Sequence, residues 1–245
     1  MSSSHTISGE PGGRSWATGF IVGLLSASLL AQPPVRLREH LRLDGSQLDL
    51  RGTAVTDDEL QQIGATEFDR VRTVLLAGTL VGDAGLAHLV RLPLRQLDLG
   101  RTRISDSGLA HLRGLPIERL ELTGTSVTDA GLLSLKGLPL SMLTLRDTKI
   151  RGTGLAALEG AALTLLDLSH SEVIDASIGT LEKTQRIGTL DLSDTPVTDQ
   201  AVQSLERIPG LSTLDLTGTS VSAASIARLQ RSRPQLTINT ARPAR

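Results

Sequence analysis

Residues 117–132 read IERLELTGTSVTDAGL and hold the pattern that decides the fold. Leu120 and Leu122 alternate with charged residues, as in a short β-strand that buries one face. Thr125 and Val127 follow in a turn. Asp129 then stands where a short helix begins, a position at which its side chain can cap free backbone amides. The segment therefore predicts one unit of strand, turn and short helix.

The same pattern recurs along most of the 245-residue chain. Its copies begin their strands at Leu48, Val74, Leu97, Leu120, Leu143, Leu166, Leu190 and Leu214, and a truncated ninth copy is Leu236-x-Ile238. A constant period indicates a solenoid, because one unit cannot bury its apolar face without neighbours. We predict an α/β solenoid, a right-handed curved horseshoe with a parallel β-sheet on its concave face and short helices on its convex face.

The composition agrees with repetition and excludes several classes of site. Aromatic residues make up only 1% of the chain, because a slot repeated in every copy is filled best by the same aliphatic side chain. The absence of Cys excludes thiolate metal sites, disulfides and Cys nucleophiles. A formal net charge of −1 supplies no overall field for nucleic acid, so no nucleic-acid partner is expected.

The spacing Ile117-x-x-Leu120-x-Leu122-x-x-Thr125, followed by Val127-Thr128-Asp129-x-Gly131-Leu132, resembles the leucine-rich repeat family. It is similar to the short-helix subgroup with LxxLxLxxTxVTDxGL repeats seen in many bacterial proteins, over about residues 46–240. The resemblance implies a non-enzymatic module that recognises a protein partner and needs no cofactor. A substrate-receptor adaptor of a ubiquitin ligase and a structural envelope scaffold are the alternatives.

One departure from the family concerns the ninth repeat position, where Asn or Cys is usual. Here a hydroxyl residue stands in every copy: Thr53, Thr79, Thr102, Thr125, Thr148, Ser171, Thr195 and Thr219. A hydroxyl can also bond the backbone of the turn, so we expect a structural hydroxyl ladder inside the solenoid.

The chain divides into five parts by composition. Residues 1–15 are polar and predict disorder, and residues 32–40 form a linker with two prolines. Residues 16–31 (WATGFIVGLLSASLLA) carry no charge and predict a signal peptide or a transmembrane anchor. Residues 41–240 form the repeat domain and 241–245 a tail. We expect a membrane-anchored protein facing outside the cytoplasm, or a secreted or periplasmic one if residues 16–31 are cleaved.

The Asp44-Gly45 pair predicts a hairpin that covers the first strand, with residues 41–43 pairing antiparallel to that strand. Such a cover is needed because an exposed strand edge promotes aggregation.

The residues between the inward leucines should point out from the concave sheet. This column is Asp49, Leu75, Asp98, Glu121, Thr144, Asp167, Asp191, Asp215 and Thr237. Stacked carboxylates repel one another, so the column needs counter-charge. In the first half Arg51, Arg101, Arg119 and Arg146 can supply it.

In the second half His170 is the only basic residue near the carboxylates in the strand positions. The acidic patch, which we define as Asp167, His170, Asp191, Asp194 and Asp215, is therefore the predicted binding site for a protein partner with basic groups. A divalent cation is the less favoured ligand. The alternative is that Asp is simply the residue that this repeat places between its leucines.

Two other constellations predict no chemistry. His88 and His111 recur in successive GLAHL segments, but two ligands on a solvent-facing helix surface do not make a metal site. Ser169, His170 and Asp167 are close in sequence, yet no oxyanion hole or pocket accompanies them. No catalytic or metal residue is predicted.

Overall fold

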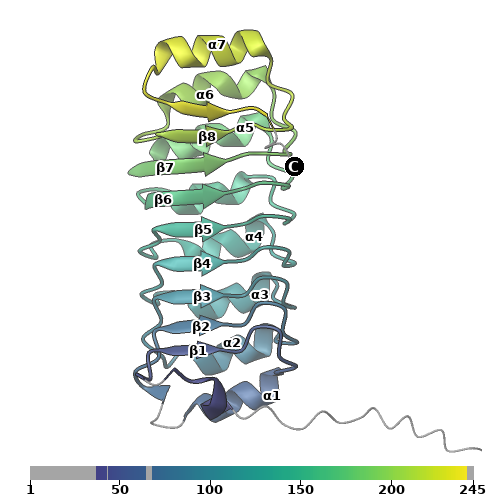
Figure 1. Ribbon diagram of the computed structural model, residues 1–245, viewed down its shortest axis with the longest axis vertical. Helices are drawn as coiled ribbons and strands as arrows, with labels where there is room; N and C mark the ends of the chain where they lie inside the picture. The colour runs from purple at the N-terminus through teal and green to yellow at the C-terminus, as the bar shows by residue number, and fades with distance from the viewer. Residues whose placement is uncertain (1–36, 43, 65–67, 242–245) are drawn as a thin grey trace, which may run out of the picture. The chain divides into compact units, whose positions relative to one another are not determined.

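The computed structural model of the protein describes residues 37–42, 44–64 and 68–241. Within them nine strands form one parallel sheet, in which each strand pairs with its neighbour in chain order (Figure 1). The strands are β1 (Gln47–Asp49), β2 (Thr73–Leu75), β3 (Gln96–Asp98), β4 (Arg119–Glu121), β5 (Met142–Thr144), β6 (Ala162–Asp167), β7 (Arg186–Asp191), β8 (Thr213–Asp215) and β9 (Thr237–Asn239). We number copies 1 to 8 after strands β1 to β8. The predicted α/β solenoid with a parallel sheet is confirmed.

Short helical turns return the chain from each strand to the next and lie on the other side of the stack from the sheet (Figure 1). The α-helices are α1 (Asp57–Leu60), α2 (Asp83–Leu89), α3 (Asp106–Leu109), α4 (Asp129–Leu132), α5 (Asp175–Ile178), α6 (Val202–Arg207) and α7 (Ala223–Ser232). The 3-10 turns are η1 (Leu37–His40), η2 (Gln61–Gly64), η4 (Ala110–Leu112), η5 (Leu133–Leu135), η6 (Thr153–Leu158), η7 (Gly179–Lys183) and η8 (Asp199–Ala201). Among the described residues, copy 5 is the one copy whose helical segment is entirely 3-10.

The core is a stack of aliphatic side chains in register. Leu120 of β4 pairs with Leu97 of β3 on one side and with Leu143 of β5 on the other. Leu120 and Leu122 are buried, as are the residues at the same two positions of the other seven copies. Burying one leucine stabilises a fold by about 1.5–3 kcal/mol before the entropy cost. The repeated leucine pair therefore holds the copies together.

Hydroxyl groups at the ninth repeat position bond the turn of their own copy. The Thr125 hydroxyl, for example, donates to the Leu122 carbonyl oxygen at 2.7 Å. The same bond, to the carbonyl three residues earlier and at 2.5–2.7 Å, is made by Thr53, Thr79, Thr102, Thr148, Ser171, Thr195 and Thr219. In the six central copies the side chain is buried. Each hydroxyl thus satisfies a carbonyl that the sheet leaves without a ladder partner.

A second ladder crosses from copy to copy and was not anticipated from the sequence. The carboxylate of Asp106, the first residue of α3, accepts from the backbone N–H of Thr128 in the next copy (2.7 Å) and from the Thr128 hydroxyl (2.6 Å). Six aspartates accept from a backbone N–H of the next copy, and all but Asp57 and Asp129 also accept from a hydroxyl there: Asp57, Asp83, Asp106, Asp129, Asp175 and Asp199. We call this set the carboxylate ladder.

The expected helix cap is therefore divided between two residues. Thr128 Oγ1 accepts from the N–H of Ala130 in its own helix, as an N-cap does. The carboxylate beside it serves the following copy instead. At the end of the ladder, the Ser222 backbone N–H is the main cause that lowers the pKa of Asp199 below its usual value, and the hydroxyls of Ser225 and Ser222 add to this.

The carboxylate ladder also explains the glycine of the TDxGL segment. A Cβ on Gly131 would lie 2.3 Å from Oδ1 of Asp106, and a Cβ on Gly108 would lie 2.3 Å from Oδ1 of Asp83. No side chain fits there while the preceding carboxylate keeps its place. Gly85 meets Asp57 in the same way, at 2.5 Å.

The hairpin expected at the N-terminal end is present where the structure describes it. Leu41 forms an antiparallel bridge with Leu48, the Arg42 N–H donates to the Gln47 carbonyl at 2.8 Å, and Gly45 adopts φ 70° in the turn. Leu43 lies outside the described residues.

At the other end the predicted register is wrong. The sheet pairs Leu214 with Ile238 and Asp215 with Asn239, while Leu236 is buried ahead of the strand. Asn239, and not Thr237, therefore continues the outward column beyond Asp215.

The expected localisation, a membrane-anchored protein facing outside the cytoplasm or a secreted or periplasmic one, is contradicted. Across residues 37–42, 44–64 and 68–241, no helix has the length and apolar character needed to cross a membrane. Residues 16–31, the segment that suggested export, lie outside the described residues, as do residues 1–15 and most of the linker.

We predict that Thr125→Val lowers the free energy of unfolding by about 1 kcal/mol, because the buried carbonyl of Leu122 loses the hydroxyl, the shorter of its two hydrogen bonds, and keeps only the Thr125 N–H at 3.2 Å. Urea unfolding followed by circular dichroism measures the change. Unaltered stability would show that water replaces the hydroxyl at that carbonyl.

We predict that Asp106→Ala lowers the free energy of unfolding by about 2 kcal/mol, because two hydrogen bonds to a charged group are lost and the Thr128 N–H is left without an acceptor. Asp58→Ala is the matched control, since Asp58 lies exposed in the first turn of α1 without a carboxylate bond to another copy. Equal effects of the two variants would contradict a stabilising role for the ladder.

Candidate functional site

The outward side of the sheet, which we call the outer sheet face, carries the column of residues that the sequence singled out. Register pairs Asp98 with Glu121, Glu121 with Thr144, and Thr144 with Asp167, and continues through Asp191 to Asp215. Neighbouring strands of a sheet lie about 4.8 Å apart, so these side chains form one row along the stack. Leu75, at the N-terminal part of the row, is buried to 8% exposure.

Every acidic member of this row bonds the chain just beyond its own strand. Asp98, Glu121, Asp167, Asp191 and Asp215 each accept from the backbone N–H two residues later, at 2.8–3.0 Å. Asp49 does the same at 3.2 Å. The carboxylates of the acidic column therefore cap the strand ends. This supports the alternative interpretation, in which the repeat itself requires Asp between its leucines and no ligand is involved.

The arginines of the first half do not neutralise the row as expected. Arg51 binds Asp49 through Nε and Nη2, at 2.9 and 2.6 Å, and this bond is the main cause that lowers the pKa of Asp49. For Arg101 and Arg119 the described residues contain no ion pair with a carboxylate of the row. Arg146 approaches Asp147 instead, at 3.8 Å. Only one of the four predicted pairings is therefore formed.

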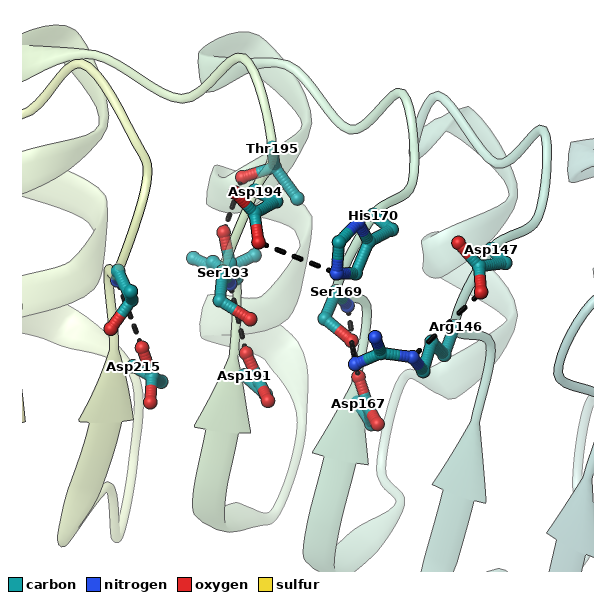
Figure 2. Close-up of polar contacts among 12 residues, drawn as sticks. Arg146, Asp147, Asp167, Ser169, His170, Asp191, Ser193, Asp194, Thr195 and Asp215 are labelled. Carbon is teal, nitrogen blue, oxygen red and sulfur yellow. Dashed lines mark hydrogen bonds and ion pairs between the residues drawn. The ribbon is translucent and has the colours of Figure 1, made fainter. Parts of the chain in front are cut away.

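In the second half the structure joins the predicted residues through two separate contacts (Figure 2). His170 Nε2 of copy 6 lies 3.3 Å from Asp194 Oδ2 of copy 7, and this contact connects the two copies. Asp167 accepts from the hydroxyl of the buried Ser169 at 2.6 Å, and Arg146 of copy 5 donates to that same hydroxyl oxygen at 3.2 Å. Arginine therefore reaches this half from the preceding copy.

Asp191 and Asp215 stand further along the row. Asp191 is held by the Ser193 N–H, and Asp215 by the Thr217 N–H and by Nδ2 of Asn239 at 3.3 Å. Both aspartates are half-buried and keep part of their carboxylate surface in contact with solvent. Among the ion pairs of the described residues, none joins Asp191 or Asp215 to a Lys or Arg.

The backbone reveals a further set of residues after each strand, directly before the residue that carries the ladder hydroxyl. This position has positive φ in all eight copies, and four of them fill it with Gly52, Gly78, Gly124 and Gly218. The other four copies hold larger side chains at φ 53–55°: Arg101, Asp147, His170 and Asp194. A non-glycine residue in this region costs about 1 kcal/mol or more, so these side chains are kept at the expense of stability.

Three of these strained residues belong to consecutive copies. Asp147, His170 and Asp194 stand in copies 5, 6 and 7 and lie side by side above the strand ends in Figure 2. His170 and Asp194 belong to the acidic patch predicted from the sequence, whereas Asp147 was not among the predicted residues. Aligning the copies would have found it, because the position is glycine in half of them.

The geometry of Ser169 does not resemble that of a nucleophile. Its hydroxyl donates to Asp167, and the Ser169 side chain is fully buried, while His170 turns to Asp194. The hydroxyl proton is directed to Asp167 and not to His170, so His170 is not placed to act as the base of a Ser-His-Asp triad. Within the described ranges no group of three or more His, Asp or Glu side chains is arranged to hold a metal ion, and this includes His88 and His111.

We compared the chain with models of known protein families and with curated protein sequences. A family model described as leucine-rich repeat matches residues 93–112, about one copy. No curated protein sequence matches the chain. The match does not distinguish the short-helix subgroup that the TDxGL segment suggests.

Solved structures with the same architecture include an internalin from Listeria monocytogenes, with 16% identity and a TM-score of 0.61 over 79% of this chain and 53% of that one. The mouse RP105/MD-1 complex shares 18% identity, with a TM-score of 0.51 over 76% of this chain and 37% of the other. The chain thus spans about half or less of the length of these proteins, and likeness at such identity shows the fold alone. The parallel stack, its period and the match of one repeat show that the chain has the leucine-rich-repeat fold.

Proposed function

We propose that the protein is a non-enzymatic recognition module that binds a protein partner through the acidic patch of its outer sheet face. The observation that carries this proposal is the row of strained residues Asp147, His170 and Asp194 beside Asp191 and Asp215. Glycine would fit the backbone of that row at lower cost, as it does in four other copies. Retaining charged side chains there is explained by a use outside the fold.

The chemistry of the patch favours a partner with basic groups. Asp191 and Asp215 project from adjacent strands, and no arginine or lysine of the described residues forms an ion pair with either. A lysine or arginine of a partner would relieve the repulsion between the two carboxylates. His170 joins the patch through its contact with Asp194.

Two further observations support recognition over catalysis. The buried Ser169 hydroxyl is bonded to Asp167 and cannot be reached by a substrate. In addition, the mouse relative RP105 is seen in complex with MD-1, which places a leucine-rich-repeat fold of this kind in a protein assembly.

The residue composition of the outer sheet face limits the affinity that we expect for a protein partner. The described part of the outer sheet face carries no aromatic side chain, and aromatic residues are the usual anchors of tight interfaces. We therefore expect binding that depends strongly on charge and weakens with added salt.

The test uses a partner captured from extract on the immobilised protein, identified by mass spectrometry, purified and titrated against variants. Asp191→Lys and Asp215→Lys together should weaken Kd at least tenfold, because two favourable charge contacts become repulsive. The measurement is a calorimetric titration at two salt concentrations.

Glu121→Lys is the matched control, because Glu121 occupies the same row and loses the same bond to a backbone N–H two residues later. It should leave Kd unchanged. Equal Kd values for the parent, the double variant and the control would rule out the acidic patch as the binding site.

A further inference from the structure

The carboxylate ladder is interrupted at one interface between copies. Asp57, Asp83, Asp106 and Asp129 bond the next copy across the first four interfaces, and Asp175 and Asp199 do so across the last two. Between copies 5 and 6 the corresponding residue is Gly152, at φ 105°. Among the described copies this is the one interface that no helix-start carboxylate crosses.

The neighbours of Gly152 have changed along with it. Copy 6 holds Ile174 where copies 1, 3, 4, 7 and 8 hold Ser or Thr, and Ile174 makes no side-chain cap bond to α5. Copy 6 also holds Ser177 in the place of the glycine that accommodates a carboxylate in copies 2 to 4 and the Asp129 backbone in copy 5. A Cβ on Gly152 would lie 2.2 Å from the Ser177 hydroxyl oxygen, so this side chain fills the space of the absent aspartate.

The hydrogen bond that takes the place of the carboxylate bonds at this interface is weaker. The Ser177 hydroxyl donates to the carbonyls of Arg151 (2.9 Å) and Ile174 (2.7 Å), and only the first of these bonds crosses the interface. At the interface between copies 4 and 5, by contrast, Asp129 accepts from three backbone N–H groups. Hydrogen bonds to a charged acceptor are about twice as strong as those between neutral groups.

Two other side-chain bonds cross this interface, from Arg146 to the Ser169 hydroxyl oxygen (3.2 Å) and from Thr164 to the Ser141 carbonyl (2.7 Å), but both lie at the strands and not at the helix start. Arg151 pairs with Glu172 across the interface at 2.9 Å, but both side chains are more than half exposed, and surface pairs of this kind contribute little. A shallow hollow lined by Arg151, Glu172, Ile174 and Pro196 opens the same flank to water. Copy 5 itself returns through η6 alone, a 3-10 segment, which has poorer hydrogen-bond geometry than an α-helix.

In a solenoid, stability is close to a sum of terms for each copy and each interface, so the weakest interface limits cooperativity. We propose that the interface between copies 5 and 6 is a built-in hinge, at which copies 6 to 8 open or unfold as a unit separate from copies 1 to 5. Two replacements relative to the other copies weaken this interface: Gly152 stands in place of the ladder aspartate, and Ser177 stands in place of a glycine.

The hinge has a consequence for the outer sheet face. All members of the acidic patch belong to copies 6 to 8, whereas Arg146, which reaches Ser169 across the interface, belongs to copy 5. Opening separates Arg146 from Ser169 and moves the patch as one body. The proposed hinge follows from the hydrogen bonds alone and does not rest on the proposed binding function.

The test is hydrogen exchange of the full chain, followed by mass spectrometry at increasing urea concentrations below the global transition. Peptides from residues 162–241 should exchange as one block, at least tenfold faster than peptides from residues 68–161. Exchange of both regions at one common rate would overturn the proposal.

A repaired variant tests the cause. R151S/G152D/I174T/S177G gives the interface the residues found between copies 3 and 4, and it should merge the two exchange blocks and slow the exchange of residues 162–241 about tenfold. The control R151S/G152N/I174T/S177G has the same shape without the charge and should keep two blocks. Two blocks in the repaired variant, or one block in both, would count against the carboxylate as the cause.

The reverse experiment does not depend on the repaired variant folding. Asp106→Ala removes the carboxylate between copies 3 and 4 and should create a new boundary between exchange blocks at that interface. If exchange in this variant changes evenly along the chain, the ladder does not set cooperativity and the hinge is excluded.

Discussion

The solenoid depends on how the backbone N–H groups between strand and helix find acceptors. In this segment each copy leaves amides that neither the sheet ladder nor the helix can satisfy, and buried amides without partners are costly. Asp106 and its equivalents solve the problem with one carboxylate that reaches into the following copy. Because the acceptor is charged and belongs to a neighbour, the same bond caps a turn and fixes the spacing of two copies.

That arrangement constrains the residues around it. The glycine two positions after the aspartate leaves room for the carboxylate of the preceding copy, as Gly131 does for Asp106. The hydroxyl of Thr128 links the two copies, since it donates to Asp106 and accepts from its own helix. The TDxGL segment is therefore better understood as a contact between two copies than as a motif within one.

On the outer sheet face, acidic residues again serve the backbone first. Asp167 and Asp191 cap the N–H groups that follow their strands, so an acidic column by itself says little about ligands. The departures from the repeat are more informative. Asp147, His170 and Asp194 occupy a left-handed position that glycine fills elsewhere, and they gather at one end of three adjacent copies. Function is sought best where a copy gives up stability relative to its neighbours.

Much of this structure could be read from sequence, because the period of Leu120 and Leu122 and their equivalents repeats the same local choice in every copy. Alternation fixes which side chains face inward, and a repeated inward face fixes parallel stacking in chain order. The outward column and the hairpin at Asp44-Gly45 follow from the same local rules. The register of β9 did not follow, because the return from α7 is set by the burial of Leu236 and not by the period.

The tertiary structure alone decided which groups meet between copies. No local rule shows that Asp106 serves Thr128 and not its own helix, that His170 turns to Asp194, or that Ser177 takes the space beside Gly152. These pairs are more than 20 residues apart in sequence, and their contact depends on how far one copy advances over the previous one. The sequence by itself therefore determined the solenoid and its faces, whereas only the stacked copies determined the carboxylate ladder, its interruption and the partners of each charged side chain.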